Sequence, residues 1–307
     1  MKELKAIPGL PPTQALESLT EINLDDLVSS FGWQALPMPA RLLRVVFRNP
    51  ARKFARWMLD FDALTGQKSL SEGARFTLRS FASRLEVHGL EHLPDGKPVL
   101  VLSNHPGMVD TLALFAAINR PDLRIIALDR PFLQSLPNVA ARLLFVGEDT
   151  QNRTQAIRQA AGHLRKGGAL LTFPAGQIEP DPQVYPGALQ ALNGWTDSAG
   201  VFLRFAPEAV IVPALVSGVL WERAVKFPLT RIKNEQFDRE KLGASLQLLA
   251  HILFNAHPLK IMVQFAPPVT LAEAGSTDMA AIHSRVLERM RGLIENLPVD
   301  SGTLLPL

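Results

Sequence analysis

Two residues of this sequence, His105 and Asp110, have the types and spacing that acid–base chemistry requires. The apolar run at residues 99–102 predicts a buried strand that ends just before the histidine. Pro106-Gly107 then turns the chain, and residues 108–118 predict a helix. On one continuous helix the two side chains would point about 140° apart, so they can meet only if the histidine stays on the loop and the aspartate lies in the first helical turn.

Such a pair would make a general base. A carboxylate bonded to one ring nitrogen fixes the histidine tautomer, and the other nitrogen is then free to take a proton from a hydroxyl. Catalysis of this kind contributes roughly 10²–10⁴ in rate. The competing interpretation is a histidine that closes a strand and an aspartate that caps a helix. The spacing alone favours that simpler interpretation, so the rest of the chain has to decide.

Composition excludes several classes of site. The chain has 307 residues, 47% of them hydrophobic, which suits one large domain or one domain with an appendage. It has no cysteine, which excludes disulfides, thiolate metal sites and a cysteine nucleophile. The first 20 residues lack the apolar segment of a signal peptide, and no run of about 18 apolar residues predicts a membrane-spanning helix.

Strand and helix patterns alternate beyond residue 83. The predicted strands after the first lie at 123–128, 143–146, 169–173, 210–216 and 260–265, and the predicted helices at 154–165, 241–255 and 278–296. This alternation predicts an α/β fold with a largely parallel or mixed sheet flanked by helices, and ligand sites at the carboxyl ends of its strands. Pro213 within one of these runs predicts an edge strand or a bulge.

The sequence His-Gly-Leu-Glu-His at residues 88–92 matches a zinc-binding pattern, His-x-x-Glu-His. That pattern needs a helix to bring both histidines to one metal. Gly89 and the alternation of Leu85 and Val87 instead predict a strand followed by a turn. We therefore expect neither a metal nor a bound cofactor.

Residues 40–61 form a basic amphipathic segment. Its five arginines fall within an arc of roughly 120° on a helix, and its aromatic side chains fall opposite. The arginines are Arg41, Arg44, Arg48, Arg52 and Arg56, and the aromatic residues are Phe47, Phe54, Trp57 and Phe61. This pattern predicts a helix on an anionic membrane surface with its aromatic face in the bilayer. The alternative is a helix docked on the core with a solvated basic face, and nucleic acid is not expected because basic residues alone do not specify it.

Two domains follow from these patterns. Residues 1–82 are expected to form an N-terminal helical, membrane-associating region, in which Asn49-Pro50 predicts two short helices with a kink between them. Residues 83–307 are expected to form the α/β domain. The protein is accordingly expected in the cytoplasm, peripheral on the inner face of the membrane.

Four blocks of sequence, in order and spacing, resemble the glycerolipid acyltransferases, the lysophosphatidic acid acyltransferase-like family with a His-x4-Asp motif. The blocks are Asn104-His105-x4-Asp110, residues 147–153 ending at Arg153, Phe173-Pro174-Ala175-Gly176, and Val212-Pro213-Ala214. The likeness extends from about residue 85 to about residue 297. The first block alone is a weak signal, whereas four blocks in order are a strong one.

The resemblance implies transfer of a fatty acyl group from acyl-CoA or acyl-carrier protein to a hydroxyl of a lysolipid or related acceptor. It assigns His105 as the base and Asp110 as its orienting group, and the acyl thioester as a co-substrate rather than a cofactor. Backbone amides near the strand ends would hold the thioester oxyanion. The residues that it places at the substrate are Asn104, Gly107, Arg153, Phe173, Pro174, Ala175, Gly176 and Gln177.

This chain departs from the family pattern at several of these positions. Gly107 stands where the family often has serine, Ala175 replaces a glutamate, and Gln177-Ile178 replaces Thr-Arg. Arg153 is then the obvious remaining cation for an acceptor phosphate, and Glu179 is a candidate to replace the missing glutamate. Two other functions stay open: a thioesterase or lipid hydrolase that uses the same base on water, and a catalytically degenerate membrane-binding protein.

Overall fold

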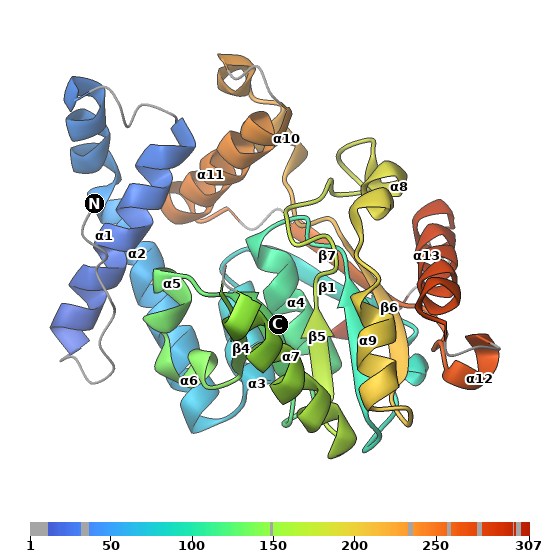
Figure 1. Cartoon of the computed structure of the whole chain (residues 1–307). Coiled ribbons are helices and arrows are strands. Elements are labelled where there is room, and N and C mark those ends of the chain that lie inside the picture. The colour runs from blue at the N-terminus through green and yellow to red at the C-terminus, as the bar shows by residue number, and fades with distance from the viewer. Residues whose placement is uncertain are drawn as a thin grey trace.

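An eight-stranded sheet organises the part of the chain that the computed structural model describes (Figure 1). The described residues are 12–31, 37–147, 150–232, 236–256, 259–274, 278–296, 298 and 302–307. The strands are β1 (Ala82–His88), β2 (Val99–Ser103), β3 (Arg124–Leu128), β4 (Leu143–Val146), β5 (Ala169–Thr172), β6 (Val210–Ser217), β7 (Leu259–Phe265) and β8 (Thr303–Leu305). Their order is β4-β3-β5-β2-β6-β7-β1-β8, so β2 lies between β5 and β6.

The sheet is mixed, as predicted. Strands β4, β3, β5, β2 and β6 run parallel, whereas β7 is antiparallel to β6 and β8 is antiparallel to β1. The carboxyl ends of β5, β2 and β6 therefore meet at one edge of the sheet, with the end of β2 in the middle. This is the edge at which ligands bind in open α/β sheets.

The expectation that Pro213 marks an edge strand is wrong, but the alternative expectation of a bulge is confirmed. β6 is a central strand, and Pro213 is in register with Leu102 of β2. On the other side of β6 the pairing is irregular at the proline, because Ile211 bridges Val269 whereas Ala214 pairs with Phe265, so two residues of β6 lie opposite three residues that follow β7. The Pro213 carbonyl still accepts a hydrogen bond from the backbone N–H of Ala266.

Helices cover the sheet and extend beyond it on one side (Figure 1). The longer helices are α1 (Pro12–Phe31), α2 (Pro37–Gln67), α3 (Leu70–Leu78), α4 (Met108–Ile118), α7 (Thr150–Arg165), α9 (Ser198–Phe205), α11 (Gln236–Phe254) and α13 (Met279–Glu295). The short ones are α5 (Pro131–Gln134), α6 (Pro137–Ala140), α8 (Ala188–Ala191), α10 (Glu222–Val225), α12 (Leu271–Ala274) and the 3₁₀ turns η1 (Leu90–His92), η2 (Leu192–Gly194) and η3 (Pro228–Ile232). In the picture α1 and α2 stand beside the sheet, and α13 lies at the opposite side.

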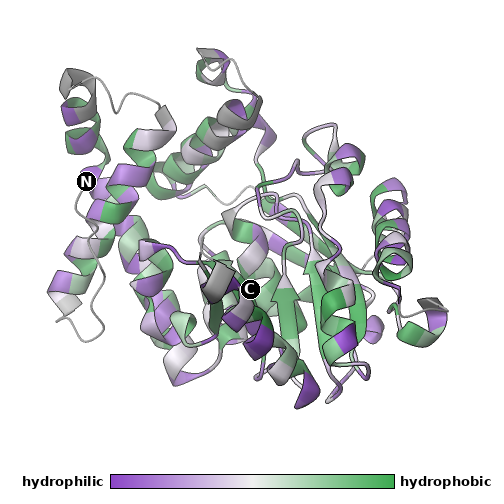
Figure 2. Ribbon diagram, in the orientation of Figure 1, coloured by the Kyte–Doolittle hydropathy of each residue, from purple (hydrophilic) through white to green (hydrophobic). Residues whose placement is uncertain are grey.

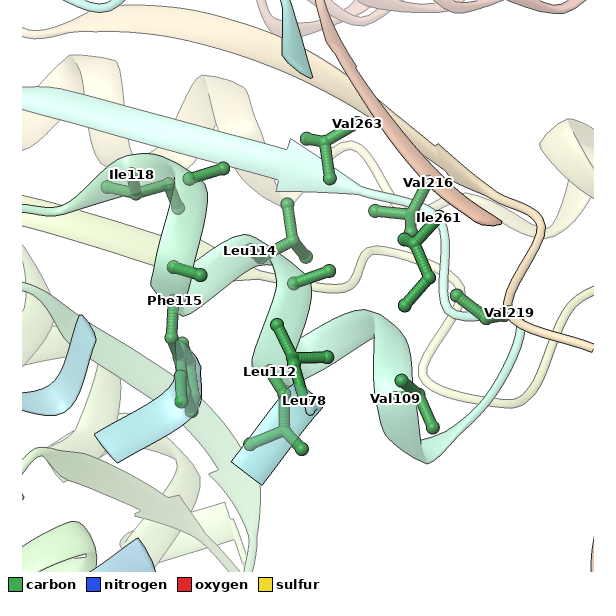
Figure 3. Close-up of a cluster of buried hydrophobic side chains, with 14 of the residues drawn as sticks. Leu78, Val109, Leu112, Leu114, Phe115, Ile118, Val216, Val219, Ile261 and Val263 are labelled. Atoms are coloured by element: carbon green, nitrogen blue, oxygen red, sulfur yellow. The ribbon is translucent and has the colours of Figure 1, made fainter. Parts of the chain in front are cut away.

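The apolar residues concentrate in the strands and in the helix faces that cover them (Figure 2). α4 is the most deeply embedded helix, because it packs between α3 and the sheet. Figure 3 shows its side chains between Leu78 of α3 and the strand residues Val216, Ile261 and Val263. Val109, in the first turn of α4, is 5% exposed. The buried side chain of Val109, next to Asp110, therefore fixes the start of α4 by its packing in the core.

α2 is one helix with Pro50 inside it, so the expectation of two short helices is wrong. Proline costs a backbone hydrogen bond in a helix interior, and that cost has to be offset by packing. Phe47 and Ala51, on either side of the proline, are buried in one apolar cluster with Leu24 and Val28 of α1. Tertiary contacts therefore keep α2 continuous where the local sequence predicted a break.

The aromatic face of α2 is packed inside the protein rather than presented to solvent. Phe47, Phe54 and Phe61 are each less than 9% exposed, which contradicts their expected role as residues in the bilayer. Two arginines of the basic face are paired across to α1. Arg44 bonds Glu21 and Asp25, and Arg48 bonds Glu17 and Glu21. α1 and α2 thus form a pair with their own apolar and ionic contacts.

Candidate active site

The loop between β2 and α4 brings His105 and Asp110 into contact. His105 lies just beyond the end of β2, and Asp110 occupies the first turn of α4. The Nδ1 atom of the histidine is 2.8 Å from Oδ2 of the aspartate. This is the arrangement that the spacing required, with the histidine on the loop and the carboxylate on the helix.

Asp110 is held in place from three sides. Its side chain is fully buried, and its oxygens accept hydrogen bonds from His105 Nδ1, from the backbone N–H of Gly107 and from the hydroxyl of Thr111. The bond from Gly107 caps the amino end of α4 at the same time. A carboxylate that cannot rotate fixes the plane and the tautomer of the imidazole.

The ring of His105 is oriented so that Nε2 is available to a ligand. The side chain is 27% exposed, and no hydrogen bond from the described part of the chain reaches Nε2. Phe173, at the exit of β5, packs against the ring with 4.5 Å between ring centroids. Burial lowers the pKa of His105, but the charge and hydrogen bond of Asp110 outweigh it and raise that pKa above its usual value.

Asn104 fastens the loop that carries His105 to β6. Its side-chain oxygen accepts from the backbone N–H of Val216 at 2.7 Å, and its amide nitrogen donates to the carbonyl of the same residue at 2.9 Å. The side chain is 4% exposed. Asn104 was expected at the substrate, but its amide is bonded to the neighbouring strand, where it continues the β2–β6 ladder by one position.

Glu179 fastens the same loop from the β5 side. Its backbone N–H donates to the carbonyl of His105 at 2.9 Å, and its Oε2 accepts from the backbone N–H of His105 at 3.0 Å. Its Oε1 accepts from the indole N–H of Trp195 at 2.7 Å. The side chain is 3% exposed, so Glu179 does not face an acceptor and cannot replace the missing glutamate of the third block by direct contact.

Asp181 organises the loop that follows β6. Its carboxylate accepts from the backbone N–H groups of Gln183, Gly218, Val219 and Leu220. From the sequence Glu179 was expected only as a candidate to replace the missing glutamate, and Asp181 was not assigned to the site. The signal that could have found them is two carboxylates on either side of a proline in the loop that follows a predicted strand, because buried charges in such a loop need partners.

The remaining predicted residues divide between the turn after β5 and the start of α7. Gly176 and Gln177 are exposed, Pro174 is buried, and Ala175 is half-buried. Gly176 has a φ of 64°, and no atom lies within 4 Å of the place a Cβ would take, so this turn is open.

Gly107, in the loop between β2 and α4, is extended at φ 165°. A Cβ there would meet only Leu220, at 3.9 Å, so the backbone would also accept the serine common in the family.

Arg153 is exposed in the first turn of α7, which follows β4. Three strand intervals separate β4 from β2, about 14 Å across the sheet. Arg130 was not predicted as a substrate-binding residue, but it follows β3 and is also exposed. By strand order Arg130 lies one interval nearer to His105 than Arg153 does, so two cations flank the same side of the histidine.

The described residues include no cluster of histidine and acidic side chains that could hold a metal ion. The two histidines of the His-x-x-Glu-His sequence have separate partners, since His88 bonds Glu86 and His92 bonds the carbonyl of Phe265. As predicted, His88 lies at the end of a strand, β1, and not in a helix.

Comparisons with known proteins agree with this geometry. A family model described as "Acyltransferase" matches residues 84–217, a range that holds all four blocks. This part of the chain is an acyltransferase domain. A search of the curated proteins gives no match. Among solved structures, the acyltransferase resembles "the 1-acyl-sn-glycerophosphate (LPA) acyltransferase, PlsC, from Thermotoga maritima", at 17% identity, a TM-score of 0.50, and coverage of 92% of this chain and 100% of that one.

The match confirms the family that the four blocks predicted. It begins in β1 and ends with β6, so it includes every element that contacts His105. The acyltransferase shares its fold with the Thermotoga structure over nearly its whole length, α1 and α2 falling outside the range of the family model. At this identity the likeness is evidence for the fold, and the reaction has to be argued from the site.

Proposed function

We propose that this acyltransferase moves a fatty acyl group from an acyl thioester to a hydroxyl of a lysolipid or related acceptor, with His105 as the general base. The donor would be acyl-CoA or acyl-carrier protein. The observation that carries the proposal is the 2.8 Å contact between His105 Nδ1 and the buried Asp110. It leaves Nε2 as the one ring nitrogen directed at a reactant.

In the proposed reaction Nε2 takes the proton of the acceptor hydroxyl as its oxygen attacks the thioester carbonyl. The tetrahedral intermediate collapses when its carbon–sulfur bond breaks, and the imidazolium returns the proton to the leaving thiolate. The products are an ester and a free thiol. The raised pKa of His105 suits the first step, because a more basic ring accepts the hydroxyl proton more readily.

Anionic acceptors fit the charges near the site. Arg130 and Arg153 are exposed at the ends of two neighbouring parallel strands, β3 and β4. In the proposed complex the acceptor phosphate binds on this side of His105, with the acceptor hydroxyl directed at the histidine. Since the turn after β5 supplies no arginine in this chain, binding of an anion would depend on these two cations.

The proposal includes an anionic membrane surface as a partner, reached from the cytoplasmic side. No helix in the described part of the chain is both long and apolar enough to span a bilayer. The first turns of α2 expose Leu42 (66%), Val45 (76%) and Val46 (57%), and Arg41 beside them is exposed. Exposed apolar side chains with a neighbouring cation are suited to the surface of an anionic bilayer.

The test is a product analysis. The purified protein is incubated with a labelled long-chain acyl-CoA, with and without a panel of lysolipids, and the labelled products are separated and identified. We expect a labelled ester that depends on the acceptor and that His105→Ala does not form. Free fatty acid formed at the same rate with and without acceptor would identify a thioesterase instead. The absence of any labelled product with both acyl-CoA and acyl-carrier protein donors would contradict the proposal.

A further inference from the structure

One buried carboxyl group at the site has no place in the reaction as described. Glu179 contacts no reacting atom, yet it bonds both polar groups of the His105 main chain, the N–H through Oε2 and the carbonyl through its own N–H. The catalytic histidine is therefore clamped from both sides of its backbone, with Asn104 fastening the preceding residue to β6.

The two hydrogen bonds of the Glu179 side chain require both of its oxygens to be acceptors. Both donors, the backbone N–H of His105 and the indole N–H of Trp195, are committed hydrogen-bond donors with no acceptor capacity. An ionised carboxylate satisfies both with its two oxygens. Protonation turns one oxygen into a donor and strains one of the two bonds. Glutamine cannot replace it fully, because its amide group would face one donor with another.

We propose that Glu179 is a positioning residue for the acyl-transfer reaction, whose ionised form holds the His105 main chain in place. The inference rests on the proposed role of His105 as the base. Trp195 supports this role, because the hydrogen bond from its indole N–H stabilises the charged form of Glu179. Loss of the negative charge would loosen the loop and weaken the base together.

The electrostatics agree with this role. Burial raises the pKa of Glu179 to about 7, against the hydrogen bonds from Trp195 and His105, which lower it. The charged groups that act on it are His105, which favours its ionised form, and Asp110, which opposes it. Glu179 in turn contributes to the raised pKa of His105, after Asp110. The pKa of Glu179 therefore lies near neutral pH.

Two substitutions at this contact should move the pH profile in opposite directions. In Glu179→Gln the histidine loses a favourable charge, so its pKa falls and the acidic limb of kcat/KM moves to lower pH with a slope of one proton. In Trp195→Phe the Glu179 carboxylate loses the hydrogen bond from the indole, so the pKa of Glu179 rises. The part of the acidic limb that reports ionisation of Glu179 therefore moves to higher pH. We also expect kcat of Glu179→Gln to fall about tenfold with little change in either KM, because the base is displaced and substrate binding is not.

A second readout does not depend on activity. The pKa of the His105 ring, followed by NMR and assigned with His105→Ala, should fall in Glu179→Gln. Asp181→Asn is the matched control, since it removes a buried carboxylate two residues away that does not act on His105. The pKa of the His105 ring in Asp181→Asn should match that of wild type. An unchanged ring pKa in Glu179→Gln, or limbs that move in the same direction in both variants, would overturn the inference, whereas transfer by His105→Ala would refute only the proposed base.

Discussion

The proposed role of His105 as a base depends on four contacts, of which only one is with the motif partner Asp110. Asp110 orients the ring, Phe173 packs on its face, and Glu179 holds its main chain at two points. Asp110 lies at the start of α4, whereas Phe173 and Glu179 both lie in the segment that follows β5. A base placed within a few tenths of an ångström has to be fixed in this way, because small displacements of a reacting group cost orders of magnitude in rate.

The first prediction concerns the base itself. His105→Ala should reduce acyl transfer by about 10³-fold or more, because the acceptor hydroxyl loses its proton acceptor. Asp110→Asn should cost less, about 10²-fold, because the ring remains but its tautomer is no longer fixed. Initial rates on a saturating thioester measure both effects, and thermal melting checks the fold. A rate for His105→Ala within threefold of wild type would remove the histidine from the mechanism.

The second prediction concerns the acceptor. Arg153→Ala should raise the KM for an anionic acceptor about tenfold or more and leave the KM for the thioester nearly unchanged, because one charged hydrogen bond contributes about 1.5–3 kcal/mol. Arg130→Ala should have a similar or larger effect, since β3 is nearer to β2. Arg158→Ala is the control, an exposed arginine further along α7. If all three variants have the same KM for the anionic acceptor as wild type, Arg130 and Arg153 do not bind the anionic group of the acceptor.

At the level of elements, the sequence predicts what depends on local pattern and misses what depends on partners. The strand at 210–216 and the strand that ends before His105 were predicted from apolar runs, because a strand buried on both faces needs one. The continuity of α2 through Pro50 was missed, since it depends on packing against α1. Glu179 was missed as part of the clamp for the same reason: its partner Trp195 lies 16 residues away, on another element.

The third prediction tests the loop after β6, which Asp181 holds beside the catalytic loop. Gly218 has a φ of +73°, and a Cβ there would lie 2.2 Å from the carbonyl oxygen of Lys260. Gly218→Ala should therefore lower the free energy of unfolding by about 1–3 kcal/mol. Gly162 in α7 has no atom within 4 Å of its Cβ position, so Gly162→Ala should raise stability by about 0.5–1 kcal/mol. Denaturant unfolding gives both values, and the opposite signs are the test.

For the molecule as a whole, charge and exposed apolar surface separate two views of α1 and α2. The net charge is only +3, and two of the five arginines of the basic face are neutralised by α1. Reversing Arg44 and Arg48 to glutamate would place like charges against α1 and disturb the helix pair. The exposed apolar side chains at the start of α2 are therefore a cleaner handle on membrane binding than the arginines.

The fourth prediction uses that handle. Leu42→Gln, Val45→Gln and Val46→Gln combined should weaken binding to anionic vesicles about 10²-fold, because each side chain would contribute about 1 kcal/mol when it leaves water for the bilayer. Phe205→Gln with Leu304→Gln is the control, since both residues are about as exposed but lie on α9 and β8. Co-sedimentation measures binding, and transfer to a short, soluble acceptor should survive in both variants. Equal vesicle binding by wild type and the α2 variant would show that the start of α2 is not the membrane contact, and that the helix is simply docked on the protein with its outer face in water.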